Sequence, residues 1–156
     1  MTASFSRRRI LSVSAGTLGL FGLAGGAGFV AWYHGGEGSG RVLTPAEAYD
    51  QATRGDLILV DIRRPDEWGL TGVGAGAVPL DMRRDDFTAE LSGLAGGDLG
   101  ADIAVICARG VRSRHLSRRL SEAGFTRVHD VPEGMLGSGA GPGWLGRGLP
   151  VTEWTG

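Results

Sequence analysis

The sequence predicts a single α/β domain, built on a parallel sheet flanked by helices and preceded by one N-terminal hydrophobic helix. The length of 156 residues fits one such domain. Between residues 41 and 153, short apolar runs alternate with amphipathic ones. Strands that alternate with helices build a parallel sheet covered on both faces. Ahead of this part, residues 10–33 carry no charge, which predicts the additional hydrophobic helix.

Residues 1–33 are predicted to be an export signal or a membrane anchor. Arg7, Arg8 and Arg9 precede the uncharged run 10–33. The letters SRRRIL resemble a twin-arginine export signal, whereas a run of this length can also span about 30 Å of hydrocarbon. Both interpretations stay open. Both predict a periplasmic or otherwise extracytoplasmic protein, which is either anchored in the inner membrane by this run or released after signal cleavage.

A glycine-rich flexible linker is predicted at residues 34–40, and the domain itself at residues 41–153.

Composition already excludes several functions. All 16 basic residues of the chain are arginine, which excludes Schiff-base chemistry and lysine nucleophiles. After residue 34 the chain holds 13 arginines against 17 acidic residues, a formal charge of −4. We therefore do not expect nucleic acid as a partner.

The first element of the domain is predicted to be a helix that begins after Thr44. Thr44 can cap this helix, and Glu47 completes a capping box with it. Ala46, Tyr49 and Ala52 are predicted to lie on its inner face. Two later helices are predicted at 83–97 and 111–125, with core-facing positions Phe87, Leu91, Leu94, Leu116, Leu120 and Ala123.

Four apolar runs predict the strands of the sheet. Strands that are buried on both faces read as short, continuous apolar segments. The four runs are residues 56–63, 76–82, 101–110 and 126–131. The tail that follows them is predicted to be mostly loop, with Trp144 and Leu145 packed against the body of the domain.

Cys107 ends the third predicted strand and is the only cysteine in the chain. In a parallel sheet, functional groups gather where a strand ends and the next helix begins. Gly110 lets the turn bend so that backbone N–H groups converge on the sulfur, and a helix that opens at about Ser113 adds its positive end. Arg109 and Arg112 add full charges nearby. These effects favour thiolate over thiol, so we expect a strong nucleophile rather than an inert core cysteine.

Neither a metal nor a cofactor is expected. A single cysteine excludes an intrachain disulfide and a zinc site with two thiolates from one chain. His34, His115 and His129 are scattered and match no metal-binding pattern. His115 is better explained as a surface residue of its predicted helix than as a general base for Cys107.

Three motifs make the sequence similar to a known family. Residues 107–113, CARGVRS, resemble the active loop of the rhodanese-like sulfurtransferases, in which an arginine closes the loop five places after the cysteine. Residues 61–68, DIRRPDEW, resemble the upstream signature of the same family, and residues 144–151, WLGRGLPV, resemble its usual ending. The sequence departs from the family at Val73 and Ala75, where histidine and proline are usual.

The resemblance implies a rhodanese-type sulfurtransferase that uses no cofactor. Cys107 would take a sulfane sulfur from an anionic donor such as thiosulfate and pass it, as a persulfide, to cyanide or a thiol. Asp61 and Arg63 are expected to be structural residues beside the site, and Arg63 and Glu67 to pair with each other or with backbone. The loop residues expected to bind the donor are Ala108, Arg109, Gly110, Val111, Arg112 and Ser113.

Two other functions compete with this interpretation. Cysteine phosphatases resemble the architecture but place five residues between cysteine and arginine, whereas four separate Cys107 from Arg112. The shorter loop suits a sulfur atom better than a phosphate. A non-turnover persulfide carrier or protein-binding module outside the cytoplasm stays open, although the intact loop arginines favour the enzyme. The expected partners are a small anionic donor, a thiol or cyanide acceptor, a partner protein in the carrier case, and the membrane if the N-terminal segment is not cleaved.

Overall fold

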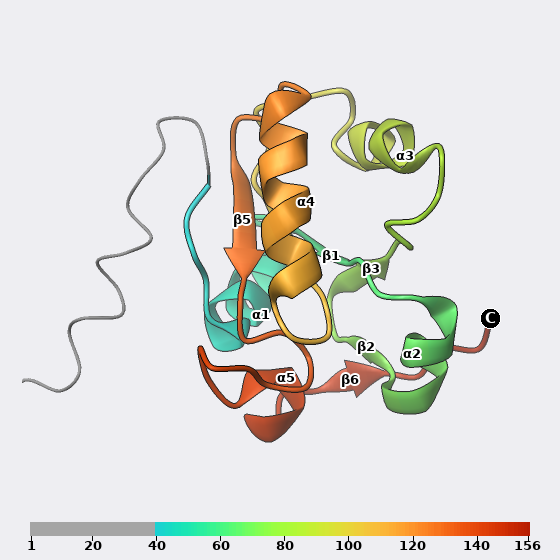
Figure 1. Ribbon diagram of the computed structural model, residues 1–156, viewed down its shortest axis with the longest axis vertical. Coiled ribbons are helices and arrows are strands. Elements are labelled where there is room, and N and C mark those ends of the chain that lie inside the picture. Colours follow the sequence, from blue (N-terminus) through green and yellow to red (C-terminus); the bar gives the residue numbers. More distant parts are fainter. Residues whose placement is uncertain (1–39) are drawn as a thin grey trace, which may run out of the picture. The chain divides into compact units, whose positions relative to one another are not determined.

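The computed structural model describes residues 40–156, and this part of the chain has the predicted α/β fold (Figure 1). A parallel sheet is flanked by helices on both faces. The predicted N-terminal helix and export signal, at residues 1–33, lie outside the described residues, as does nearly all of the predicted linker. Within residues 40–156, no helix combines the length and the hydropathy that crossing a membrane requires.

Four parallel strands form the central sheet in the order β3-β1-β4-β5. Each lies inside one of the four predicted apolar runs, which confirms those strand predictions. Their bounds are Ile58–Asp61 for β1, Ala77–Pro79 for β3, Ile103–Ile106 for β4 and Val128–Val131 for β5. Asp61 pairs with Ile106, and Ile106 with Val131, so these three strands end at the same edge. The residues that follow them therefore meet there.

Five helices and a small second sheet complete the described part of the chain. The helices are α1 (Pro45–Arg54), α2 (Pro65–Thr71), α3 (Phe87–Leu94), α4 (Val111–Glu122) and α5 (Gly143–Gly146). Strands β2 (Val73–Gly74) and β6 (Val151–Thr152) pair antiparallel. In Figure 1, α2, α5 and β6 lie toward the end of the sheet to which the β5 arrow points, where α4 also begins. This end holds the cysteine loop.

Helix α1 confirms the predicted cap and corrects the predicted inner face. Thr44 Oγ1 accepts a hydrogen bond from the Glu47 amide, and the Glu47 carboxylate accepts one from the Thr44 amide. Tyr49 and Ala52 pack against the core as expected, together with buried Ala48. Ala46 is exposed instead, because the helix turns by about 100° per residue and Ala48, not Ala46, shares the face of Ala52.

The core has one part on each face of the sheet. One part contains side chains of α3 and α4, including Phe87, Leu91, Leu116 and Leu120, while the other contains side chains of α1 and α5. Three predicted core positions are wrong. Leu94 and Leu145 are 41% and 36% exposed and Ala123 is exposed; all three lie at or next to the last residue of a helix. For Leu94 and Ala123, a helical pattern extended to the final turn overestimates burial, because the chain turns away there. Leu145 was predicted in a loop and lies instead in the short helix α5.

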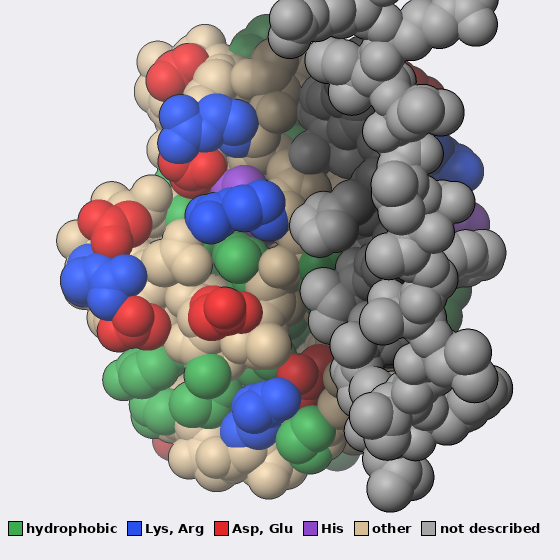
Figure 2. All heavy atoms as spheres, turned by 90° about the vertical axis from the view of Figure 1, so that its left-hand side faces the viewer, with side chains coloured by type: hydrophobic (Ala, Val, Ile, Leu, Met, Phe, Trp, Pro, Cys, Tyr) green, Lys and Arg blue, Asp and Glu red, His purple; other side chains and the backbone are tan. Residues whose placement is uncertain are grey.

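Charges of both signs are interspersed over the visible, described part of the face in Figure 2. The described part of the chain contains exposed ion pairs between neighbouring side chains, such as Arg54 with Asp50 and Arg127 with Asp102. Exposed pairs of this kind contribute little to stability, typically about 0.2–1 kcal/mol each. They leave no single-sign field on that visible surface.

Candidate active site

Cys107 follows β4 directly and lies in a tight loop that ends at Gly110, the residue before α4. The helix begins at Val111, the first residue of the predicted range 111–125 and two residues before the opening expected at about Ser113. Gly110 has a φ of +79°, and a Cβ atom built on it would lie 2.1 Å from the Pro132 carbonyl oxygen. Only glycine fits there without distortion. The bend at Gly110 therefore keeps the loop short and wrapped around the sulfur.

The Cys107 sulfur is buried, with the residue 1% exposed, and is contacted from two sides by polar groups. The Gly110 amide donates a hydrogen bond to Sγ at 3.1 Å. The Ser113 hydroxyl lies 3.7 Å from Sγ and donates to the Gly110 carbonyl oxygen at 3.2 Å. One amide and one hydroxyl thus face the sulfur from the loop and the first turn of α4. Groups that donate hydrogen bonds to a sulfur stabilise its anion.

Arg112, the residue that closes the loop, forms a two-point ion pair with Glu67 on α2. Its Nη1 and Nη2 atoms lie 2.7 and 2.6 Å from the two Glu67 carboxylate oxygens. Arg112 lowers the pKa of Glu67 to about 2. The pKa of Arg112 is raised, by Glu67 first and also by Cys107, so the guanidinium lies near both the carboxylate and the sulfur. An anion that approached this guanidinium would compete with Glu67.

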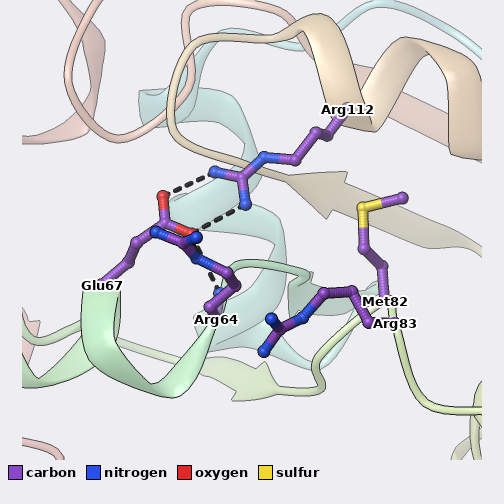
Figure 3. Close-up of a pocket in the computed structure, with 5 residues that line it drawn as sticks. All are labelled: Arg64, Glu67, Met82, Arg83 and Arg112. Carbon is purple, nitrogen blue, oxygen red and sulfur yellow. Dashed lines mark hydrogen bonds and ion pairs between the residues drawn. The ribbon is translucent and has the colours of Figure 1, made fainter.

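A pocket of about 510 Å³ lies in front of this ion pair (Figure 3). Pockets of this size hold small organic ligands. Figure 3 shows the Glu67 and Arg112 side chains joined to each other, with Met82 and Arg83 to the right of the pair. The side chains that line it are Arg64, Glu67, Met82, Arg83 and Arg112. Sequence reasoning missed Arg64 and Met82 altogether. It placed Arg83 at the start of the predicted helix 83–97, because nothing local in the sequence places residue 83 beside residue 112.

The other loop residues expected to bind donor face several directions. Arg109 is exposed, and its Nη1 donates to the Gly137 carbonyl oxygen at 3.3 Å, so it packs along the segment after β5. Val111 is 65% exposed. Ala108 is half-buried, and its carbonyl oxygen accepts a hydrogen bond from the Leu136 amide. The structure therefore brings Gly110, Arg112 and Ser113 around the sulfur, while Arg109 and Val111 lie at the rim.

Asp61 and Arg63 form a buried ion pair at the end of β1. Their side chains are 0% and 1% exposed, and Arg63 Nη2 lies 2.7 Å from Asp61 Oδ2. Arg63 also donates to Thr71 Oγ1 and to the Gly72 carbonyl oxygen, which ties β1 to the end of α2. The expected contact with Glu67 is made through the Glu67 carbonyl oxygen at 3.3 Å, which leaves the Glu67 carboxylate for Arg112.

The two described histidines lie away from the sulfur's hydrogen-bonded surroundings. His115 is exposed on α4. His129 is buried in β5, accepts a hydrogen bond from the Arg41 amide and contacts Asp102 at 2.9 Å. Across residues 40–156, His, Cys, Asp and Glu side chains form no group of three or more suited to a metal ion. The chemistry available at the site is that of the sulfur, the loop amide, a hydroxyl and arginines.

Comparison with known proteins agrees with this geometry. The chain matches the rhodanese-like domain family over residues 44–138. No curated protein matches it significantly. Among solved structures it is similar to the polysulfide-sulfur transferase homodimer from Wolinella succinogenes, with 25% identity, a TM-score of 0.57, and 83% of this chain and 90% of that one covered. It is also similar to Rv0390 from M. tuberculosis, with 26% identity, a TM-score of 0.56, and coverage of 74% and 98%. The chain belongs to the rhodanese-like domain family.

Proposed function

We propose that this protein is a sulfurtransferase that moves a sulfane sulfur through a Cys107 persulfide. In the first step the Cys107 thiolate attacks the outer sulfur of thiosulfate. The S–S bond of the donor breaks, and sulfite leaves with the electron pair. In the second step cyanide or a thiolate attacks the outer sulfur of the persulfide, which returns Cys107 as a thiolate. No outside oxidant or reductant is needed, because the sulfane sulfur is transferred as a neutral atom.

The observation that carries this proposal is the Gly110 amide, 3.1 Å from the Cys107 sulfur at the start of a helix. Both the thiolate and the persulfide are anions, and a fixed amide donor in a buried site stabilises such charges without reorganising. Ser113 supplies a second polar group to the sulfur. The helix N-terminus at Val111 adds a favourable potential within its first turn. A nucleophile held in this way needs no separate general base.

We further propose that the donor enters through the pocket in front of Arg112. The donor is an anion, and the arginines that line the pocket are Arg112, Arg64 and Arg83. Each is paired with a carboxylate, so the donor would compete with these carboxylates for the guanidinium groups. The pocket volume of about 510 Å³ is larger than thiosulfate alone would fill. A group the size of a water molecule occupies only about 30 Å³, and thiosulfate is a small anion. The similar Wolinella succinogenes protein is a polysulfide-sulfur transferase. We therefore include a polysulfide anion beside thiosulfate as a candidate donor.

Intact-mass analysis after thiosulfate treatment tests the proposal. The wild-type chain should gain the mass of one sulfur atom, and Cys107→Ala should gain nothing. Adding cyanide should then remove the sulfur and release thiocyanate. An unmodified wild-type chain after treatment with both thiosulfate and polysulfide would refute the proposal.

The same experiment separates the enzyme from the carrier. The alternative is a non-turnover persulfide carrier or protein-binding module, and the burial of Cys107 at 1% exposure favours such a protected cargo site. An enzyme releases many equivalents of thiocyanate per chain from excess donor and cyanide. A carrier loads one sulfur and holds it until a partner protein presents its thiol.

We also propose, from the sequence alone, that the domain works outside the cytoplasm. The support is the arginine cluster at residues 7–9 followed by the uncharged run at residues 10–33. Protease treatment of intact spheroplasts should digest the domain, and treatment of sealed inside-out vesicles should leave it intact. The mass of the digested or released chain reports whether the first 33 residues have been cleaved.

A further inference from the structure

Asp130 is a buried carboxylate that the sulfur-transfer steps above do not use. It lies in β5, pairs in register with Val105 of β4, and is 8% exposed. Neither carboxylate oxygen has a hydrogen-bond partner within 3.5 Å in the described part of the chain. Buried carboxylates without partners are rare, because the lost hydration costs several kcal/mol. The fold itself does not explain why a carboxylate without partners is kept buried here, which indicates a functional role for Asp130.

Side-chain alternation places Asp130 on the same face of the sheet as Cys107. Val105 and Cys107 belong to the core part that contains α4, and so does Val128, two residues before Asp130. Residues two apart in a strand share a face. Strand β5 neighbours β4. Asp130 in β5 and Cys107 directly after β4 therefore lie on neighbouring segments of the sheet, beneath the same helix.

Ser113 of α4 links the two groups. Its side chain is fully buried, and its hydroxyl lies 3.7 Å from the Cys107 sulfur. The Ser113 side chain also lowers the pKa of Asp130, although no hydrogen bond joins the two side chains in this structure. Burial has the larger effect and raises the pKa of Asp130 to about 6, while the Arg114 guanidinium opposes the rise. A hydroxyl has one hydrogen, and Ser113 donates it to the Gly110 carbonyl oxygen in this structure. The sulfur anion and the carboxylate can each gain this hydrogen only at the expense of that bond, and they cannot gain it together.

We propose that Asp130 is a positioning residue that controls, through Ser113, how well the site stabilises the Cys107 sulfur anion. When Asp130 is ionised, its carboxylate attracts the Ser113 hydroxyl hydrogen and repels the thiolate. When Asp130 is neutral, the Gly110 carbonyl oxygen is the remaining competitor for this hydrogen, and the hydroxyl donates more readily to the thiolate or persulfide. The sulfur anion and the buried carboxylate thus compete for one hydrogen. This inference needs a reactive Cys107 but not any particular donor or acceptor.

The charged groups around Asp130 set the direction of the effect. Arg114 faces it from α4 and favours its ionised form. His129 and Asp102 interact with each other and lie toward the opposite face, because His129 is the next residue in the strand. The strand side of Asp130 contributes backbone groups of residues 41 and 43. The carboxylate and the sulfur are therefore the two groups on this face that can both carry negative charge near Ser113.

A double-mutant cycle on the purified full chain tests the proposal. The rate of Cys107 alkylation by iodoacetamide is measured by intact mass across pH, which reports the thiolate population without any sulfur donor. The chains compared are wild type, Asp130→Asn, Ser113→Ala and the double variant. Asp85→Asn removes an exposed carboxylate and serves as the matched control. Sulfur loading by thiosulfate is measured separately on the same samples.

We expect Asp130→Asn to move the alkylation midpoint to lower pH by about one pH unit, the tenfold effect of one hydrogen bond to a charged group. Ser113→Ala should move the midpoint to higher pH, which gives a second measure if the first variant folds poorly. In the Ser113→Ala background, Asp130→Asn should have a much smaller effect. An unchanged midpoint, or an equal shift in both backgrounds, would overturn the role of Ser113. If the double-mutant cycle gives the expected shifts but thiosulfate loads no sulfur, the proposed function is refuted and the role of Asp130 is not.

Discussion

Replacing Asp130 by asparagine measures what a buried charge costs this fold. Asp130 is 8% exposed, and burial raises its pKa from 3.8 to about 6. A carboxyl group with a raised pKa binds its proton more tightly in the folded state, so stability falls as the pH rises between these two values. The difference corresponds to about 3 kcal/mol of unfolding free energy at 1.36 kcal/mol per pKa unit. Above about pH 6 that stability is absent from the wild-type chain.

Asparagine removes the charge but still buries a polar amide, which costs about 1–2 kcal/mol without partners. We therefore expect Asp130→Asn to raise the unfolding free energy at neutral pH by about 1–2 kcal/mol, the part of the 3 kcal/mol that remains. For a domain of this size the melting temperature should rise by about 3–8 °C. The gain should disappear as the pH falls to about 4.5–5 and should reverse below about 3.8, where the wild-type carboxyl group is protonated in both states and only the cost of the buried amide remains.

Thermal unfolding followed by circular dichroism at several pH values checks this result. Glu67 and Glu133 have lowered pKa values and titrate in both chains, so only the difference between wild type and variant reports Asp130. The exposed control Asp85→Asn should leave the melting temperature within about 1 °C. A variant less stable than wild type at neutral pH, or a difference that does not depend on pH, would refute the argument.

Three further predictions concern the loop and its ion pair. Gly110→Ala should destabilise the domain by about 1–3 kcal/mol or more and abolish sulfur loading, since a Cβ atom would lie 2.1 Å from the Pro132 carbonyl oxygen; chemical denaturation and intact mass report the two effects. Arg112→Lys keeps the charge but loses the two-point contact with Glu67, so we expect a raised KM for thiosulfate with retained loading at saturation. Glu67→Gln releases Arg112, and we expect a lower KM for thiosulfate together with lost stability. Because the pKa of Glu67 is lowered to about 2, the stability that its ionised form contributes is present above 4.5 in the wild type and is lost as pH falls toward 2. Guanidinium denaturation of wild type and Glu67→Gln should therefore converge at low pH, and a constant difference would contradict this.

Local sequence patterns predict the framework of this fold and miss its long-range contacts. The capping box of Thr44 and Glu47 and the four strands depend on neighbouring residues, so their residue types are sufficient to find them. Helix α2 at residues 65–71 was not predicted, because it is short and two of its seven residues are glycine and proline. The ion pair of Glu67 and Arg112 joins residues 45 positions apart. No periodicity within either segment indicates it.

The residues of the candidate site also form two groups, one that local sequence patterns predict and one that depends on the whole fold. Cys107, Gly110 and Arg112 lie within six residues, and a strand–turn–helix pattern with a flexible glycine is enough to place them together. Asp130 was not singled out, because in the run VHDV a single acidic residue looks like the exposed face of an edge strand. Its burial comes from α4 packing over β5, which depends on the whole fold.

The burial of the sulfur decides where selectivity in this domain must lie. At 1% exposure, Cys107 presents little surface for a donor or an acceptor to recognise directly. A lone cysteine also cannot pass its sulfur to a second thiol in the same chain. If the donor enters through the pocket as we propose, it is bound first at the arginines there, and it gains Arg112 only at the expense of Glu67. A donor with enough negative charge to displace that carboxylate would be favoured over a neutral one. On this argument a neutral organic disulfide should form a mixed disulfide with Cys107, releasing its other half as a thiolate, far more slowly than thiosulfate forms the persulfide. Glu67→Gln should change the thiosulfate rate much more than the disulfide rate. Equal changes for both reagents would show that the ion pair controls access to the sulfur without discriminating by charge.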